Sequence, residues 1–295
     1  MQVSVKEDRH KYIGGSDIPI IMGISSFKTR FDLLLEKAEL KENDFEGNKY
    51  TEYGNVMEEK IRTYINESLG KKFKEGQYIK DDIRCHTDGT DSTSVLEIKT
   101  TSDIHKEVDD YKVYLVQLLF YMLHTEKNSG FLAVYHRPED FNENFDKDRL
   151  QLFAINIDNY KDLIAEINEA VDRFRSDLKK VKENPLITEE ELQPMELINV
   201  ANSVVALEQK LAEFKTIKAE HEALKQELKT AMEKYSVKKW TTNNGTQITL
   251  IEDAPDKEVQ KFNEDKFKEE NKELYEKYLE TKIQKGKSGY VKVTL

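Results

Sequence analysis

The chain has 295 residues, of which 38% are apolar and 35% charged, and its formal net charge at pH 7 is −11. This length allows one large domain or two smaller ones. The single cysteine, Cys85, excludes a disulfide framework and any zinc site or iron–sulfur cluster held by four cysteines. The acidic balance argues against indiscriminate binding of nucleic acid, although contacts with phosphate need only local cations.

Apolar runs are short along the whole chain. The longest, near residues 113–123, does not reach membrane-spanning length, and residues 1–9 are polar. We therefore expect a soluble protein of the cytoplasm, with no membrane partner.

The N-terminal segment predicts a helix start. Residues 14–17 read Gly-Gly-Ser-Asp, a flexible turn followed by capping residues, and an apolar run to Met22 follows. Free amides at a helix start suit an anion. The simpler interpretation is that Ser16 only caps the helix. A second helix is predicted over residues 29–40.

Residues 52–70 predict a longer helix, because their apolar residues recur at helical spacing. The predicted apolar stripe contains Val56, Ile61, Tyr64, Ile65 and Leu69. A strand is predicted over residues 71–80.

Residues 84–99 carry the strongest chemical signal. They predict a strand ending at residues 84–86, a turn over residues 89–93 and a second strand over residues 94–99. Side chains at i and i+2 of a strand share a face, so Glu97 and Lys99 point the same way while Ile98 points into a core. The hairpin can bring Asp88 beside them.

Two carboxylates and a lysine at one point form a hard-oxygen site suited to Mg²⁺ or Mn²⁺. The lysine can orient an attacking water while the cation offsets negative charge on a phosphate. The alternative is a surface hairpin with an ordinary Glu/Lys pair, because charged residues are common.

Residues 111–124 predict a strongly apolar helix. Gln117 and Tyr121 are four residues apart and therefore share one helix face. A glutamine in so apolar a helix needs a hydrogen-bond partner. Either the lysine, water or phosphate of an active site supplies that partner, or a backbone group of the core does.

Strands are predicted over residues 131–135 and 150–157, and an amphipathic helix over residues 159–183. Residues 188–236 then predict a long helix whose apolar residues recur in threes and fours, with a break at 214–217 that resembles a stammer. This pattern fits either a coiled-coil interface or a helical hairpin folded onto its own domain.

The C-terminal residues predict a hairpin over 238–251 around Asn244-Gly245 and a charged helix over 258–281. The tail, residues 281–295, contains Tyr290 and four lysines but no acidic residue.

The spacing of Asp88, Glu97 and Lys99 resembles the D…(D/E)-x-K core of the PD-(D/E)xK nuclease superfamily. Within it, the chain is similar to the YqaJ-type viral recombinase and phage lambda exonuclease family. Gly54 and Glu58 match the G-x-x-x-E helix of that family, which supplies a further acid.

Two more motifs carry this resemblance. Gln117 and Tyr121 match the family's Q-x-x-x-Y element, and Arg9 and Ser16 match its R-x6-S element, which holds a DNA 5′-phosphate. The family often carries an arginine after the lysine. Here only His105 and Lys106 are available.

The resemblance implies an α/β fold with a small mixed central sheet flanked by helices. A nuclease domain over residues 1–185 would be followed by a mostly helical region over residues 186–295. It further implies an exonuclease that digests the 5′ strand of double-stranded DNA ends and leaves 3′ overhangs.

The implied metal ligands for Mg²⁺ or Mn²⁺ are Glu58, Asp88, Glu97 and the Ile98 carbonyl. Lys99 would position and activate the water. Gln117 and Tyr121 would steady the lysine and the phosphate, and Arg9 and Ser16 would read the 5′-phosphate.

The implied partners are double-stranded DNA ends, a single-strand annealing protein and further copies of the chain in a trimer, in a bacterial cell that hosts a phage or prophage. Two alternatives stay open. One is an endonuclease that cuts internally or at branched DNA, and the other is a non-catalytic protein that binds DNA or a partner through its long helix.

Overall fold

The computed structural model describes residues 8–42, 47–251, 253, 258–280 and 289. The chain divides into two compact units, Met1–Leu192 and Gln193–Leu295. Among the described helices, none combines the length and apolarity needed to span a bilayer.

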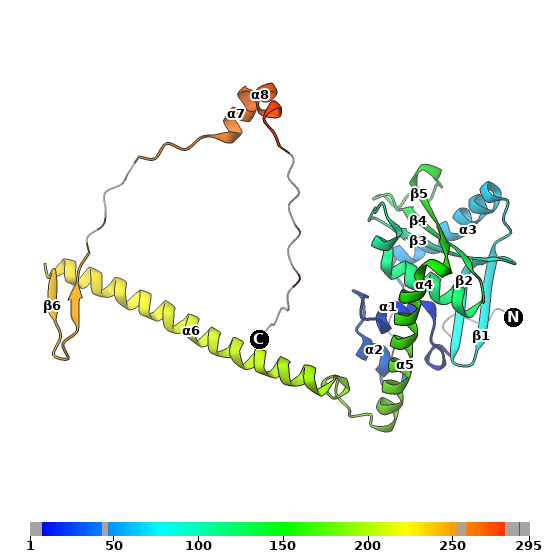
Figure 1. Cartoon of the computed structure of the whole chain (residues 1–295), viewed down its shortest axis with the longest axis horizontal. Coiled ribbons are helices and arrows are strands. Elements are labelled where there is room, and N and C mark those ends of the chain that lie inside the picture. The colour runs from blue at the N-terminus through cyan, green and yellow to red at the C-terminus, as the bar shows by residue number, and fades with distance from the viewer. Residues whose placement is uncertain (1–7, 43–46, 252, 254–257, 281–288, 290–295) are drawn as a thin grey trace. The chain divides into compact units, whose positions relative to one another are not determined.

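A five-stranded mixed sheet forms the centre of the first unit (Figure 1). Its strands, in spatial order, are β1 (Lys74–Lys80), β2 (Ile83–Thr90), β3 (Ser94–Thr101), β4 (Ser129–His136) and β5 (Leu150–Asn156). Neighbouring strands are antiparallel except β3 and β4, which are parallel and connected through a helix, as parallel strands require.

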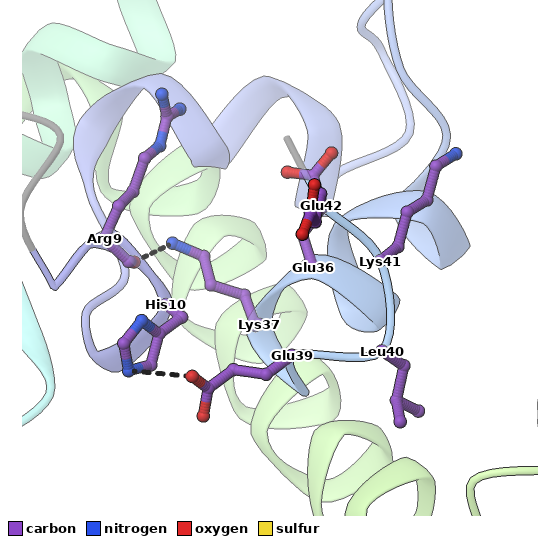
Figure 2. A pocket seen from close by; sticks show the side chains of 8 residues that line it. All are labelled: Arg9, His10, Glu36, Lys37, Glu39, Leu40, Lys41 and Glu42. Carbon is purple, nitrogen blue, oxygen red and sulfur yellow. Dashed lines mark hydrogen bonds and ion pairs between the residues drawn. The ribbon is translucent and has the colours of Figure 1, made fainter. Parts of the chain in front are cut away.

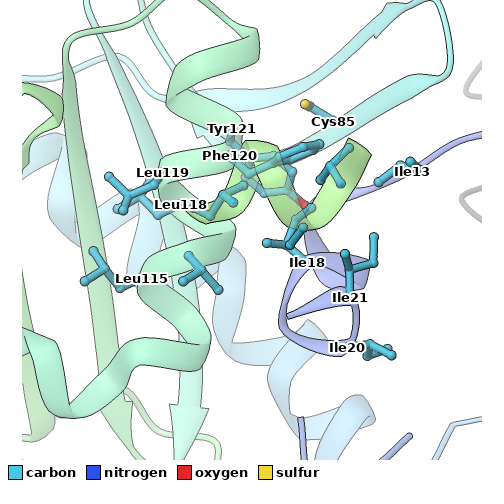
Figure 3. Close-up of a cluster of buried hydrophobic side chains, with 14 of the residues drawn as sticks. Ile13, Ile18, Ile20, Ile21, Cys85, Leu115, Leu118, Leu119, Phe120 and Tyr121 are labelled. Carbon is cyan, nitrogen blue, oxygen red and sulfur yellow. The ribbon is translucent and has the colours of Figure 1, made fainter. Parts of the chain in front are cut away.

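Helices cover both faces of this sheet. They are α1 (Ile18–Ile21), α2 (Arg30–Lys37), α3 (Lys49–Leu69), α4 (Lys112–His124) and α5 (Lys161–Glu183). The larger hydrophobic cluster contains residues of α1, α2, α4 and α5, and Figure 3 shows Ile18 and Tyr121 within it. The smaller cluster joins α3 to the sheet. The expected α/β fold, a mixed sheet flanked by helices, is therefore confirmed.

The parallel strands at the centre are buried on both faces. Val95 and Val134 belong to the larger cluster, whereas their neighbours Leu96 and Ala133 belong to the smaller one. This alternation follows from the period of two residues in a strand. It places Glu97 and Lys99 on the face of Val95, which α4 covers.

The predicted apolar stripe of α3 is wrong at two positions. Val56 is 38% exposed and Leu69 is 43% exposed, whereas Tyr53 and Met57 are buried in line with Ile61 and Ile65. The predicted period was right, but its phase was displaced toward the wrong side of the helix.

Two local predictions near the site also need correction. Gly89 and Thr90 continue strand β2, and the turn is confined to residues 91–93, where Asp91 Oδ1 accepts the N–H groups of Thr93 and Ser94. At the N-terminus, a 3₁₀ turn (Gly15–Asp17) precedes the short α1, and Ser16 is exposed. No side chain caps α1, so the expectation that Ser16 caps this helix is wrong.

The second unit contains α6 (Met195–Lys234), β6 (Lys239–Thr241), β7 (Gln247–Thr249), α7 (Glu264–Glu270) and α8 (Lys272–Lys277). The predicted long helix begins directly after Pro194, its N-cap residue, whose φ of −58° is fixed by the proline ring near the helical value. It is one uninterrupted helix of 40 residues, so a helical hairpin within it is excluded.

The predicted C-terminal hairpin is confirmed, and Gly245 in its turn adopts φ +84°, a left-handed value that favours glycine. The single charged helix predicted over 258–281 is wrong. Asn271 (φ −136°) separates α7 from α8. The lysines of the predicted tail lie outside the described residues.

Candidate active site

Strands β2 and β3 pair at only two positions, Gly89–Leu96 and Thr90–Val95. Beyond these pairs the strands separate, and the Ile98 N–H loses a backbone acceptor on β2. The Asp88 side chain replaces it, because Asp88 Oδ2 accepts the Ile98 N–H at 2.7 Å. The opening between the two strands thus brings Asp88 beside the segment that carries Glu97 and Lys99.

Glu97 is fully buried, and its Oε1 forms an ion pair with the Lys99 ammonium. Apart from this contact with Lys99, neither carboxylate oxygen accepts a hydrogen bond from a described residue. Burial, and then the neighbouring Asp88, raise the pKa of Glu97 to about 8, against the attraction of Lys99. A buried carboxylate with so few partners is unfavourable unless nearby cations compensate its charge.

Lys99 lies at the edge of the opening, with 27% of its side chain exposed. Burial acts to lower its pKa, but Glu97 and Asp88 outweigh burial and raise the pKa above its ordinary value. Lys99 is therefore an ammonium ion at neutral pH. It directs positive charge toward the space beside the two acids.

Helix α3 contributes Glu58 from the side of the opening. Burial and the nearby Asp88 raise the pKa of Glu58 to about 7, while Arg62 opposes the increase. Arg62 Nη1 donates to Glu58 Oε1 at 2.9 Å and to the Asp88 carbonyl at 2.6 Å, and its Nη2 donates to Glu75 Oε1 at 2.6 Å. Arg62 therefore ties α3 to the strand that carries Asp88.

Sequence reasoning did not identify Arg62 as part of the site. The available signal was its position four residues after Glu58, because such pairs face each other on a helix. The contact with the Asp88 carbonyl requires the tertiary structure.

The acids fit a hard divalent cation by their chemistry. Burial raises the pKa of Asp88 as well, despite Lys99, so three carboxyl groups with raised pKa values border one opening. Their oxygens are the ligands that Mg²⁺ and Mn²⁺ prefer. As placed, no three His, Cys, Asp or Glu side chains in the described ranges lie close enough to hold an ion together. Arg62 occupies the place between Glu58 and the Asp88 backbone.

Helix α4 places Gln117 and Tyr121 on the side of Glu97. Gln117 Nε2 donates to the Tyr121 hydroxyl at 3.2 Å, so its partner is a side chain of the same helix face and neither of the two partners that we expected. Burial raises the pKa of Tyr121, and Glu97 and Asp88 raise it further, because the phenol lies within their electric field. Tyr114, one turn before Gln117, also raises the pKa of Lys99 and was not predicted.

The N-terminal segment forms a separate charged cluster. Asp17 is buried and pairs with the buried Lys37 at 2.7 Å and with Arg9 at 3.4 Å. Lys37 Nζ also donates to the carbonyls of Arg9 and Tyr12. Sequence reasoning missed Lys37, because nothing in a helical pattern indicates that a lysine is buried by a distant aspartate.

Arg9 borders a hollow of about 570 Å³ in this region (Figure 2). Figure 2 shows Lys37 directed at the Arg9 carbonyl and the His10 ring beside Glu39. The residues that line the hollow are Arg9, His10, Glu36, Lys37, Glu39, Leu40, Lys41 and Glu42. Ser16 is exposed and does not line this hollow, so the structure does not bring Arg9 and Ser16 to one cavity.

Backbone groups of His105, in the loop after β3, form hydrogen bonds that fix this loop. The His105 N–H donates to the Tyr111 hydroxyl and the His105 carbonyl accepts from Gln151. The His105 ring packs edge-on against Tyr111, and Lys106 is exposed. His105 is therefore engaged in the loop's own packing.

Residues 6–128 match the model of the YqaJ-like viral recombinase domain. A curated relative, the uncharacterized protein YqaJ of Bacillus subtilis (strain 168), is 29% identical over 140 residues. That alignment covers 43% of this chain and 44% of the relative, so the shared part spans less than half of the relative's length.

Two solved structures also resemble the chain. A phage-related exonuclease from Haemophilus somnus 129PT has a TM-score of 0.47 at 20% identity, over 58% of this chain and 94% of the other. An alkaline exonuclease from Laribacter hongkongensis has a TM-score of 0.45 at 19% identity, over 59% of this chain and 91% of the other. All the residues described around the opening, from Glu58 to Tyr121, lie inside the matched family segment. Residues 6–128 of this chain are therefore similar to the YqaJ-like viral recombinase domain, the family that the motifs of the sequence indicate.

Proposed function

We propose that this chain is a metal-dependent deoxyribonuclease that digests the 5′ strand of double-stranded DNA ends and leaves 3′ overhangs. The observation that carries the proposal is the buried Glu97, which lies beside Asp88 and whose one partner among the described residues is the Lys99 ammonium. The arrangement lies inside the segment that matches the YqaJ-like viral recombinase domain, and this match supports DNA as the substrate.

Glu58, Asp88 and Glu97, with the Ile98 carbonyl, would hold Mg²⁺, and Mn²⁺ could substitute for it. When bound, the cation supplies Lewis acidity at the phosphate and makes a coordinated water more acidic. Because Arg62 contacts both Glu58 and the Asp88 carbonyl, it fixes the distance between α3 and β2.

Lys99 has a different role from a general base. In the metal-free chain, Glu97 and Asp88 raise the pKa of Lys99, so the ammonium is charged and has no free electron pair to accept a proton. Instead it donates hydrogen bonds, which orient the attacking water and stabilise negative charge that develops on the phosphate. Gln117 and Tyr121, which are hydrogen-bonded to each other, would steady the lysine and the phosphate.

Arg9 would hold the 5′-phosphate of the strand that is digested, whereas Ser16, which lies outside the hollow that Arg9 borders, is given no part in that contact. The support is that 41% of the Arg9 side chain is exposed at the border of the hollow, where its guanidinium can reach an anion. Asp17 holds the backbone of this segment through the Gly14 N–H. The partners proposed from the family are a single-strand annealing protein and further copies of the chain, in the cytoplasm of a bacterium that hosts a phage.

The test is digestion of labelled linear double-stranded DNA by the full chain in Mg²⁺ or EDTA. We expect label at the 5′ ends to be released first, only with metal, and a covalently closed circle of the same sequence to remain intact. Cleavage of the circle would favour the endonuclease alternative. Specific DNA binding without any metal-stimulated cleavage would favour the non-catalytic alternative.

A further inference from the structure

Helix α6 carries an apolar stripe that nothing in the described chain covers. Its side chains are between 37% and 69% exposed. The stripe consists of Leu197, Val200, Val204, Leu207, Leu211, Phe214, Ile217, Leu224 and Leu228. A stripe of this width and period is the seam along which one helix packs against another.

The stripe follows two heptad frames that share Phe214. In the first frame Leu197, Val204 and Leu211 occupy position a, and Phe214 occupies position d. The interval of three residues between Phe214 and Ile217 shifts the frame, so that Phe214 also occupies position a of the second frame. The second frame continues to Tyr235.

Charges beside the seam determine which orientation is favourable. In the second frame, position g holds Glu213, Glu220 and Glu227, and position e holds Lys218 and Lys225. In a parallel pair of helices, each g residue faces the e residue five positions later on its partner. Glu213 then faces Lys218 of the partner helix and Glu220 faces Lys225, twice each by symmetry.

An antiparallel pair would reverse this arrangement. Position e would face e and position g would face g, which puts lysine against lysine and glutamate against glutamate. The side chains in question are exposed, so each is accessible to a partner helix. By the first frame Lys210 would face Lys215 of the partner helix, but Lys215 follows the frame shift at Phe214 and occupies position b of the second frame, away from the seam.

We propose that α6 pairs with α6 of a second copy of this chain, in parallel and in register. This surface is independent of the nuclease site. Two features of the seam indicate that the partner helix has the same sequence as α6. The glutamates and lysines complement each other only in a parallel self-pair, and the frame shift at Phe214 matches itself only in register.

The first test measures the mass of the full chain by light scattering and sedimentation. The lysine variant carries Glu213→Lys and Glu220→Lys, and the glutamate variant carries Lys218→Glu and Lys225→Glu. Each variant alone places like charges along the seam, so we expect its association to weaken roughly ten- to hundred-fold at low salt. An equimolar mixture of the two should recover the mass of the unaltered chain.

The second test reads orientation by oxidative cross-linking of the full chain. Leu224 occupies position d and faces itself in a parallel, in-register pair, so Leu224→Cys should form a disulfide-linked dimer. Glu222→Cys, which points away from the seam at position b, is the matched control. The native Cys85 is buried and does not compete.

Three results would overturn the proposal. They are a single-copy mass for the unaltered chain, masses that do not change in either charge variant, and equal cross-linking at positions 222 and 224. Circular dichroism of each variant verifies that α6 stays helical.

Discussion

Lys99 is charged because of the two acids beside it, and that charge gives it a defined role. Lys99→Ala should reduce cleavage by about 10²- to 10⁴-fold, since it removes electrostatic stabilisation of the transition state. DNA binding should remain nearly intact. The measurements are single-turnover digestion and fluorescence anisotropy with end-labelled DNA.

Lys80→Ala, at an exposed position near the end of β1, serves as the control for loss of one positive charge. Near-normal turnover of the Lys99 variant would remove this residue from the mechanism.

The raised pKa of Glu97 also has a consequence for stability. Its folded-state value of about 8 exceeds the ordinary value of 4.5, so the folded protein binds this proton more tightly than the unfolded chain does. Between these two values stability falls as pH rises, and the full loss is present above pH 8. For a buried group, the loss is on the order of a few kcal/mol.

Glu97→Gln mimics the protonated acid, so in EDTA it should melt at a higher temperature than the unaltered chain at pH 8 and at a similar temperature at pH 5. Asp88→Asn should act in the same direction, because the two carboxylates repel each other. Both variants should bind Mg²⁺ more weakly. Unchanged Mg²⁺ affinity in calorimetric titrations would mean that the metal site is elsewhere.

Arg9 permits a test that separates ligand binding from folding. Arg9→Ala should slow digestion of 5′-phosphorylated DNA by roughly ten- to hundred-fold and of 5′-hydroxyl DNA much less, since a charged contact contributes about 1.5–3 kcal/mol. Ser16→Ala should leave the melting temperature unchanged, because Ser16 caps no helix. An equal loss on both DNA substrates would mark Arg9 as structural.

At the scale of elements, the 3₁₀ turn before α1 is locked against α4. A Cβ added at Gly15 would lie 2.3 Å from Cε1 of Tyr121, too close for any contact. Gly15→Ala must displace the ring or the turn, so we expect a loss of about 1–3 kcal/mol in unfolding free energy. The loss is measured by denaturant titration.

Gly54→Ala is a suitable control on α3. There the new Cβ would meet Thr100 at 3.6 Å, an ordinary contact, and alanine favours a helix. If Gly15→Ala were as stable as Gly54→Ala, the packing of this turn on Tyr121 would not be tight.

Elements with a strong period were predictable from the sequence, whereas contacts across elements were not. The strand that carries Glu97 and Lys99 and the apolar helix with Gln117 and Tyr121 follow from local patterns. The phase of α3 was misjudged because Val56 and Met57 are adjacent apolar residues and a helix period alone does not choose between them. The burial of Lys37 by Asp17 and the two bonds of Arg62 depend on residues distant in the chain.

At the scale of the whole molecule, both hydrophobic clusters lie within residues 1–192. A chain that ends at Leu192 should therefore fold with a melting temperature close to that of the full chain and keep its Mg²⁺-dependent cleavage. The measurements are calorimetry and digestion of short linear DNA. A truncated chain that does not fold would show that the second unit is needed for the first.

The net charge of −11 sets a further expectation for the intact molecule. Productive DNA contacts must be concentrated at few cations, so affinity should depend only moderately on salt. The logarithm of the DNA-binding constant should therefore fall less steeply with the logarithm of salt concentration than it does for a protein that contacts many phosphates.

The Asp88–Ile98 bond provides a spectroscopic probe of the site. Its amide proton is held by a side-chain carboxylate at 2.7 Å, whereas neighbouring amides of a strand are held by carbonyls. Protonation of Asp88, or coordination of its carboxylate by a cation, would alter the electron density at that acceptor. The nitrogen and proton chemical shifts of Ile98 should therefore follow both events at one resonance, before any DNA is present.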